Sequence, residues 1–138
     1  MKFINQLLLK YYRWHEKRRI KKEEAWKNFF LNEYGINCDI DKDKLTHQDI
    51  LEIFWKILKG MEGYDVSNFD SNTSTKAPAK QSWVWNDLGE DDFIRYLEKF
   101  FEFFNIKITS AEYDQVKTFG ELADLILKKS KEHKLGQQ

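Results

Sequence analysis

Apolar residues recur every three or four positions along most of the chain, which is the spacing of amphipathic helices. The pattern predicts helices over residues 3–14, 22–34 and 46–60. A fourth, longer helix is expected from Asp91 to Phe104, where aromatic residues follow one another at helical intervals. A short helical turn and a last helix are expected after it. The basic stretch between the first two helices is interpreted as a solvated helix face or a helix junction.

Helix boundaries are marked by recognisable residues. Thr46, Thr109 and Thr118 are each followed three residues later by Asp or Glu, which is the pattern of a capping box. Gly35 and Gly60 stand where the preceding helices are expected to end. These signals predict where the second, third and last two helices stop or start.

Residues 61–82 interrupt the helical pattern with Ser, Asn, Thr, Asp, Gly and the single Pro. Such composition is typical of a loop, and a connection this long is uncommon inside a compact domain. It is either a binding loop or a flexible insertion, and we expect the insertion. Trp83 and Trp85 then return the chain to the core or to a surface platform. The polar tail, residues 130–138, is expected to fray.

The 138 residues include one Pro and six Gly, and a third of them are charged. We therefore expect one all-α domain, a small helical bundle. Its parts are an N-terminal helical extension (1–45), a helix (46–60), the flexible loop (61–82), further helices (83–129) and the tail.

Charge is distributed unevenly although the formal net charge is zero. Residues 1–22 carry eight Lys or Arg against one Glu. A basic segment on an acidic body indicates either an anionic partner or attraction between the two halves, and we favour the attraction. The run of basic residues between 10 and 22 is also able to contact phosphates, or membrane head groups beside an amphipathic helix. Its role stays open, and the neutral whole predicts no nucleic-acid partner.

Reactive residues are few. Cys38 is the only cysteine, which favours a reducing, cytoplasmic compartment and a small buried side chain rather than a nucleophile. His15, His47 and His133 are scattered, and the sequence has no glycine-rich phosphate loop. No apolar run is long enough to cross a membrane, and we identify no signal peptide. We predict a protein that is not an enzyme and that needs no metal or cofactor.

Residues 87–127 resemble the second half of an acyl carrier protein. The resemblance rests on Asp87-Leu88-Gly89, the acidic helix ending at Phe104, the Ile106-x-Ile108 step, and residues 117–122 opening the last helix. In that family a serine that opens the long helix carries phosphopantetheine. Here Asp92 or Glu90 falls at that serine, depending on the anchor of the alignment, and neither accepts the arm. The run Glu90-Asp91-Asp92 is similar to a bacterial carrier-like family of unknown function with Gly-Asp-Asp at this place.

The resemblance implies a carrier-protein shape without a prosthetic arm, and therefore a module that works by contact with another protein. The start of the long helix is the expected interface, with carboxylates to attract a basic partner and aromatic side chains to anchor it. The candidate residues are Trp83, Trp85, Asp87, Leu88, Glu90, Asp91, Asp92 and Phe93.

Two alternatives remain at this point. Small size, an acidic patch and exposed aromatic residues also suit an immunity or antitoxin protein that blocks a basic toxin. A true carrier modified at an unconventional residue is the third possibility. The sequence identifies neither the partner nor the oligomeric state.

Overall fold

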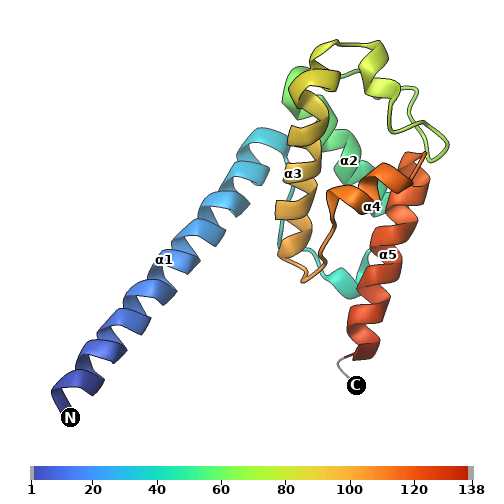
Figure 1. Cartoon of the computed structure of the whole chain (residues 1–138). Coiled ribbons are helices and arrows are strands. Elements are labelled where there is room, and N and C mark those ends of the chain that lie inside the picture. The colour runs from blue at the N-terminus through green and yellow to red at the C-terminus, as the bar shows by residue number, and fades with distance from the viewer. Residues whose placement is uncertain (1, 137–138) are drawn as a thin grey trace.

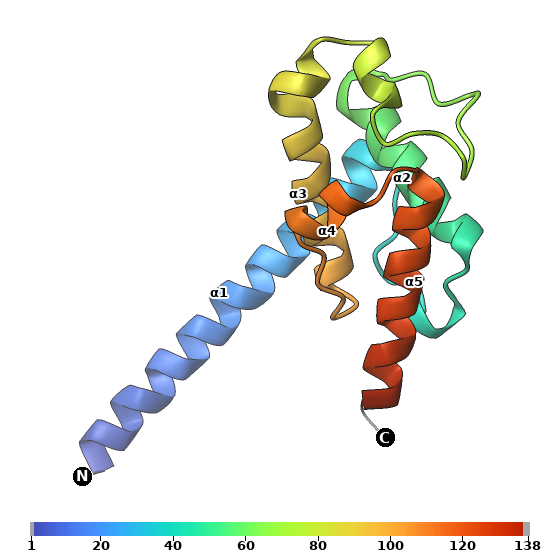
Figure 2. The same ribbon diagram turned by 45° about the vertical axis from the view of Figure 1, so that its right-hand side comes forward.

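The computed structural model describes residues 2–136, with side chains described for residues 6–61 and 63–132. The described chain is an all-α bundle without a sheet; one isolated backbone bridge joins Ser74 to Thr118. Helices α2 (His47–Glu62), α3 (Glu90–Glu102), the short α4 (Ser110–Gln115) and α5 (Phe119–Gly136) pack together. A helix of 33 residues, α1 (Lys2–Tyr34), projects from the bundle as an arm (Figures 1 and 2). The prediction of an all-α bundle is confirmed.

The N-terminal segment differs from the expectation of two helices, because α1 is continuous. Residues 15–22 contain neither Gly nor Pro, so nothing interrupts the backbone. Arg19 also binds Glu16 and Glu23 at 2.8 and 2.9 Å, joining neighbouring turns through this stretch. The basic stretch is therefore a helix face and not a junction.

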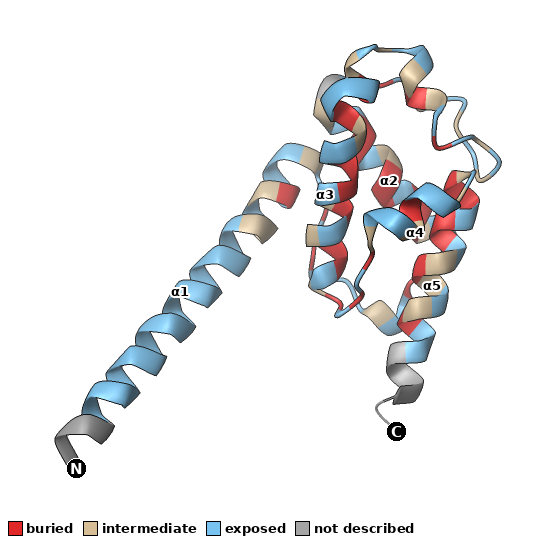
Figure 3. Cartoon of the chain, viewed as in Figure 1, coloured by how far each residue is buried: buried red, intermediate tan, exposed pale blue. Residues whose placement is uncertain are grey.

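Only the last two turns of α1 join the bundle, and Figure 3 shows the change from exposed to buried along the helix. Phe30 is fully buried and its ring meets that of Phe100 at 5.4 Å, while Phe29 contacts Tyr96. Gly35 then adopts a φ of +65° and donates its N–H to Leu31, ending the helix as predicted.

Helix α2 extends past the predicted end. Thr46 and Asp49 form the expected capping box, but the helix ends at Gly63, with a φ of +68°, and not at Gly60. Gly60 lies inside the helix against the ring of Tyr34, where an added Cβ would collide with it. The glycine therefore permits close packing of α1 on α2 instead of a turn.

Residues 63–84 are not an unpacked insertion, contrary to expectation. The segment lies along the start of α5, where the backbone N–H groups of Thr75, Phe119 and Gly120 donate to Lys117, Thr73 and Ser71. The side chain of Gln81 binds both the N–H and the carbonyl of Asp65. Thr75 and Pro78 are buried, so the segment forms one wall of the bundle.

The tail was expected to fray; in the structure α5 continues to Gly136, and Ser130 is buried. Gln137 and Gln138 lie outside the described residues.

One ion pair gives the bundle a measurable pH dependence. Lys129 of α5 binds Glu112 of α4, whose carboxylate also closes the predicted capping box with Thr109. The bond to Lys129 above all, with the bonds to Thr109, lowers the pKa of Glu112 below its usual 4.5.

We expect the Glu112→Gln variant to lose about 1 kcal/mol of stability at neutral pH. A carboxylate whose pKa is lower in the folded state stabilises the fold above its unfolded pKa and loses that contribution as the pH falls through the folded value. The deficit of the variant should therefore shrink below pH 4.5, as urea unfolding at several pH values would show. An equal deficit at acidic and neutral pH would contradict the ion pair.

Candidate functional site

The helical path that leads into α3 begins earlier than the sequence indicates. The side-chain oxygen of Ser82 accepts the N–H of Val84 at 3.2 Å, which caps the start. A π-helical segment, η3 (Trp85–Gly89), follows and runs directly into α3, since Gly89 already has helical φ and ψ. Asp91 and Asp92 therefore follow more than one turn of existing helix, although α3 itself starts at Glu90, close to the predicted start near Asp91.

Two of the candidate interface residues belong to the core. Trp85 and Phe93 are both fully buried, and their rings lie 5.7 Å apart. Trp85 also contacts Tyr64, and Phe93 contacts three further aromatic rings, those of Phe54, Tyr113 and Phe119. Neither side chain is able to anchor a partner without opening the bundle, so both are removed from the candidate surface.

The remaining residues form an exposed face, which we call the α3 entry surface: Trp83, Asp87, Leu88, Asp91 and Asp92. Trp83 is 75% exposed and Leu88 is 66% exposed, which is unusual for side chains of this size. All three aspartates are exposed as well.

The spacing of these residues places carboxylates beside the apolar group. Residues four apart in a helix lie on the same side, so Asp87 and Asp91 form one row while Leu88 and Asp92 form the next. The two rows are adjacent, which flanks Leu88 with acidic side chains. The surface thus combines an exposed apolar centre with negative charge.

Glu90 has a different position from the three aspartates. It is half-buried and binds Lys76 of the 63–84 segment at 2.7 Å. Its charge is compensated, and the pair ties the segment to the start of α3. We therefore assign Glu90 to the support of the α3 entry surface rather than to the surface itself.

The segment 63–84 supplies residues that the sequence did not single out. Lys76 and Ser82 hold the start of the helical path, and Gly89 allows Tyr64 to approach, since a Cβ there would lie 3.1 Å from the Tyr64 hydroxyl. These contacts join residues far apart in the chain. Only the Ser82 cap, two residues before a helical segment, had a local signal that could have been found.

The described part of the chain offers little support for a cysteine nucleophile or a metal site. Cys38 is buried, and burial, opposed by Lys27, raises the pKa of its thiol to about 11, which disfavours a thiolate. His47 binds Asp124 at 2.8 Å and links α2 to α5. Among described residues, no group of three or more His, Cys, Asp or Glu side chains is placed to hold a metal ion.

Within the same residues, no helix is both long and apolar enough to cross a bilayer. Comparisons with protein-family models, curated proteins and solved structures find no match to this chain.

Proposed function

We propose that the protein is a non-catalytic, acyl-carrier-protein-like module that binds another protein through the α3 entry surface. The observation that carries the proposal is the exposure of Trp83 and Leu88 beside Asp87, Asp91 and Asp92. Large apolar side chains that are surrounded by charge are typical of the centre of an interface. The carboxylates would attract a partner with a basic surface and increase its rate of association.

The absence of an attachable hydroxyl at the start of α3 supports a function by contact alone. The two positions that the carrier resemblance offers for the serine are Glu90 and Asp92, both carboxylates. The nearest serine in the chain, Ser82, is half-buried and uses its oxygen as a cap. A protein of carrier-like shape with this surface would bind its partner directly, without a phosphopantetheine arm.

The test is affinity capture from the native cells with the wild-type protein and the variant Asp87→Lys/Asp91→Lys as baits. Reversing two exposed charges should slow association at low salt by about tenfold or more, with a smaller effect at high salt. The matched control is Glu52→Lys/Glu98→Lys, which changes the same charge at exposed positions outside the α3 entry surface.

Loss of the captured protein with the first variant alone supports the proposal. Equal capture by both variants would contradict it. A captured basic toxin that the wild-type protein inhibits would favour an immunity protein acting through the same surface.

A further inference from the structure

Residues 6–25 of α1 make up an exposed surface of the described structure. Every residue from Gln6 to Ala25 is exposed (Figure 3). The arm nevertheless carries large apolar side chains that are between 41% and 64% exposed. These side chains are Leu7, Leu8, Leu9, Tyr11, Tyr12, Trp14 and Ile20.

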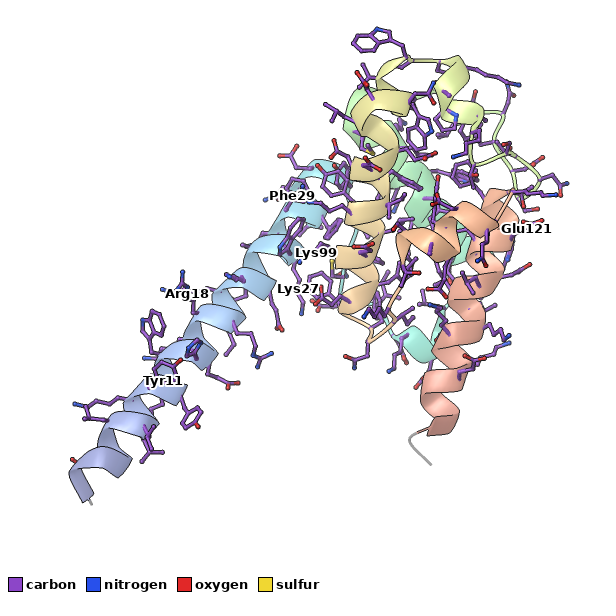
Figure 4. All side chains as sticks on the ribbon, viewed as in Figure 1. Tyr11, Arg18, Lys27, Phe29, Lys99 and Glu121 are labelled. Atoms are coloured by element: carbon purple, nitrogen blue, oxygen red, sulfur yellow. The ribbon has the colours of Figure 1, made fainter. Side chains whose placement is uncertain are left out.

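Most of these side chains share one side of the helix. Leu7, Tyr11 and Trp14 are spaced four and three residues apart, which aligns them along the helix, and Leu8 lies beside them. Figure 4 shows Tyr11 and Arg18 on the part of α1 that extends away from the bundle. The arm is therefore amphipathic over residues 7–14, with an apolar stripe that the bundle does not cover.

Positive charge borders this stripe. Lys10, Arg13 and Lys17 are spaced three and four residues apart and so form a row next to the apolar one. No ion pair in the described part of the chain uses any of the three. Arg18 lies over the ring of Trp14, with its guanidinium carbon 5.2 Å from the ring centre. The partner that fits must accept both apolar side chains and several cations.

A second copy of the arm fits this pattern poorly. Continuing the line of Leu7, Tyr11 and Trp14 leads to Arg18 and Lys21, so a parallel pair of helices would bring like charges together in its seam. An antiparallel pair would be limited to about two turns of apolar contact, which is marginal for a stable helix pair.

We propose that residues 6–22 of α1 bind the surface of a bilayer that contains anionic lipid. Leucine, tyrosine and tryptophan would enter the boundary between head groups and acyl chains, while the flanking lysines and arginines would contact lipid phosphates. Charge also sets the orientation. Residues 23–138 carry fifteen Lys or Arg against twenty-two Asp or Glu, so an anionic surface repels the bundle while it attracts the arm. This inference is independent of the function proposed for the α3 entry surface.

Vesicle sedimentation with the full-length protein tests the proposal. We expect binding to vesicles of phosphatidylcholine mixed with phosphatidylglycerol, weaker binding at high salt, and little binding to phosphatidylcholine alone. The variant Lys10→Glu/Arg13→Glu should lower the affinity at least about tenfold, since each cation near such a surface contributes about fivefold. The matched control, Lys56→Glu/Lys80→Glu, reverses two exposed charges on the bundle and should bind as the wild type does or up to a fewfold more weakly.

A second measurement, tryptophan fluorescence, reports whether the apolar stripe enters the bilayer. Tryptophan emission of the wild-type protein should shift to shorter wavelength on the anionic vesicles, and Trp14→Phe should retain binding while losing most of the shift. The substitutions in α1 change no bundle residue, and an unchanged circular dichroism spectrum would show that each variant, the control included, is folded. The proposal would be overturned if the protein did not bind the anionic vesicles, or if it bound neutral vesicles equally well. It would also be overturned if the wild-type protein bound no vesicles but self-associated without lipid, and Leu7→Gln abolished that self-association.

Discussion

The variant Phe93→Ala should lose about 3–5 kcal/mol of stability to urea unfolding, the usual cost of removing a fully buried phenylalanine. The ring is completely buried and contacts the rings of Phe54, Trp85, Tyr113 and Phe119. Removing it leaves a cavity where α2, α3, α4 and α5 meet. Since domains of this kind are stable by about 5–15 kcal/mol, a large share of the total would disappear.

The matched control for Phe93→Ala is Leu88→Ala on the α3 entry surface. Leu88 is 66% exposed, so its truncation should change stability by about 0.5 kcal/mol or less. Together the two variants distinguish residues that pack in the core from residues that are free to contact a partner. A Phe93→Ala protein as stable as the wild type, but defective in binding a partner, would restore Phe93 as a surface anchor and contradict the packing.

The second large effect is expected at Gly120, in the first turn of α5. Its N–H donates to the carbonyl oxygen of Ser71 at 2.8 Å, and an added Cβ would lie 2.5 Å from that same oxygen. The obstacle is backbone, so no side-chain rotation relieves it, and the 63–84 segment would have to move. In an open helical position, replacing glycine by alanine stabilises by about 1 kcal/mol. Here we expect Gly120→Ala to destabilise by about 1–3 kcal/mol.

Limited trypsin digestion should reveal which part moves in Gly120→Ala, because Lys76 and Lys80 lie in the displaced segment. We expect faster cleavage there. The matched control is Gly35→Ala, whose cost of about 1–2 kcal/mol comes from a φ of +65° in open space. It should leave cleavage at the two lysines unchanged. A stabilised Gly120→Ala protein would show that the segment is not held against α5.

Local signals in the sequence predicted the helix boundaries best. Thr46 with Asp49 and Thr109 with Glu112 form capping boxes as expected, and Gly35 has the left-handed conformation that ends α1. Each of these features depends on residues within a few positions of one another. The chemistry that stops or starts a helix there is fully contained in the local sequence.

Features that depend on distant contacts were not predictable in this way. The segment 63–84 resembles a flexible loop because the backbone groups that fix it belong to residues 117–120. Gly60 resembles a helix end because nothing nearby reveals that Tyr34 packs on it. Trp83 and Trp85 look equivalent in sequence, yet Trp83 is exposed, while Trp85, the first residue of the π-helical segment, is buried.

The candidate site was therefore only partly predictable. The sequence located the region and its negative charge, since carboxylates are visible without a fold. It could not separate the exposed side chains of the α3 entry surface from the core residues Trp85 and Phe93, or show that Glu90 is paired with Lys76. Those distinctions depend on which side of the helical path faces the bundle. Because the helical path already starts near Ser82, the residues that face the bundle differ from those expected for a helix that starts at Asp91.

The central proposal is that this protein acts through contact at the start of α3 and carries no prosthetic arm. Intact-mass spectrometry tests it after incubation with a phosphopantetheinyl transferase and coenzyme A, with an authentic acyl carrier protein in the same tube as the positive control. We predict that the control gains the mass of the arm while this protein keeps its original mass. A gain of that mass on this chain, at Ser82 or at any other residue, would contradict the account.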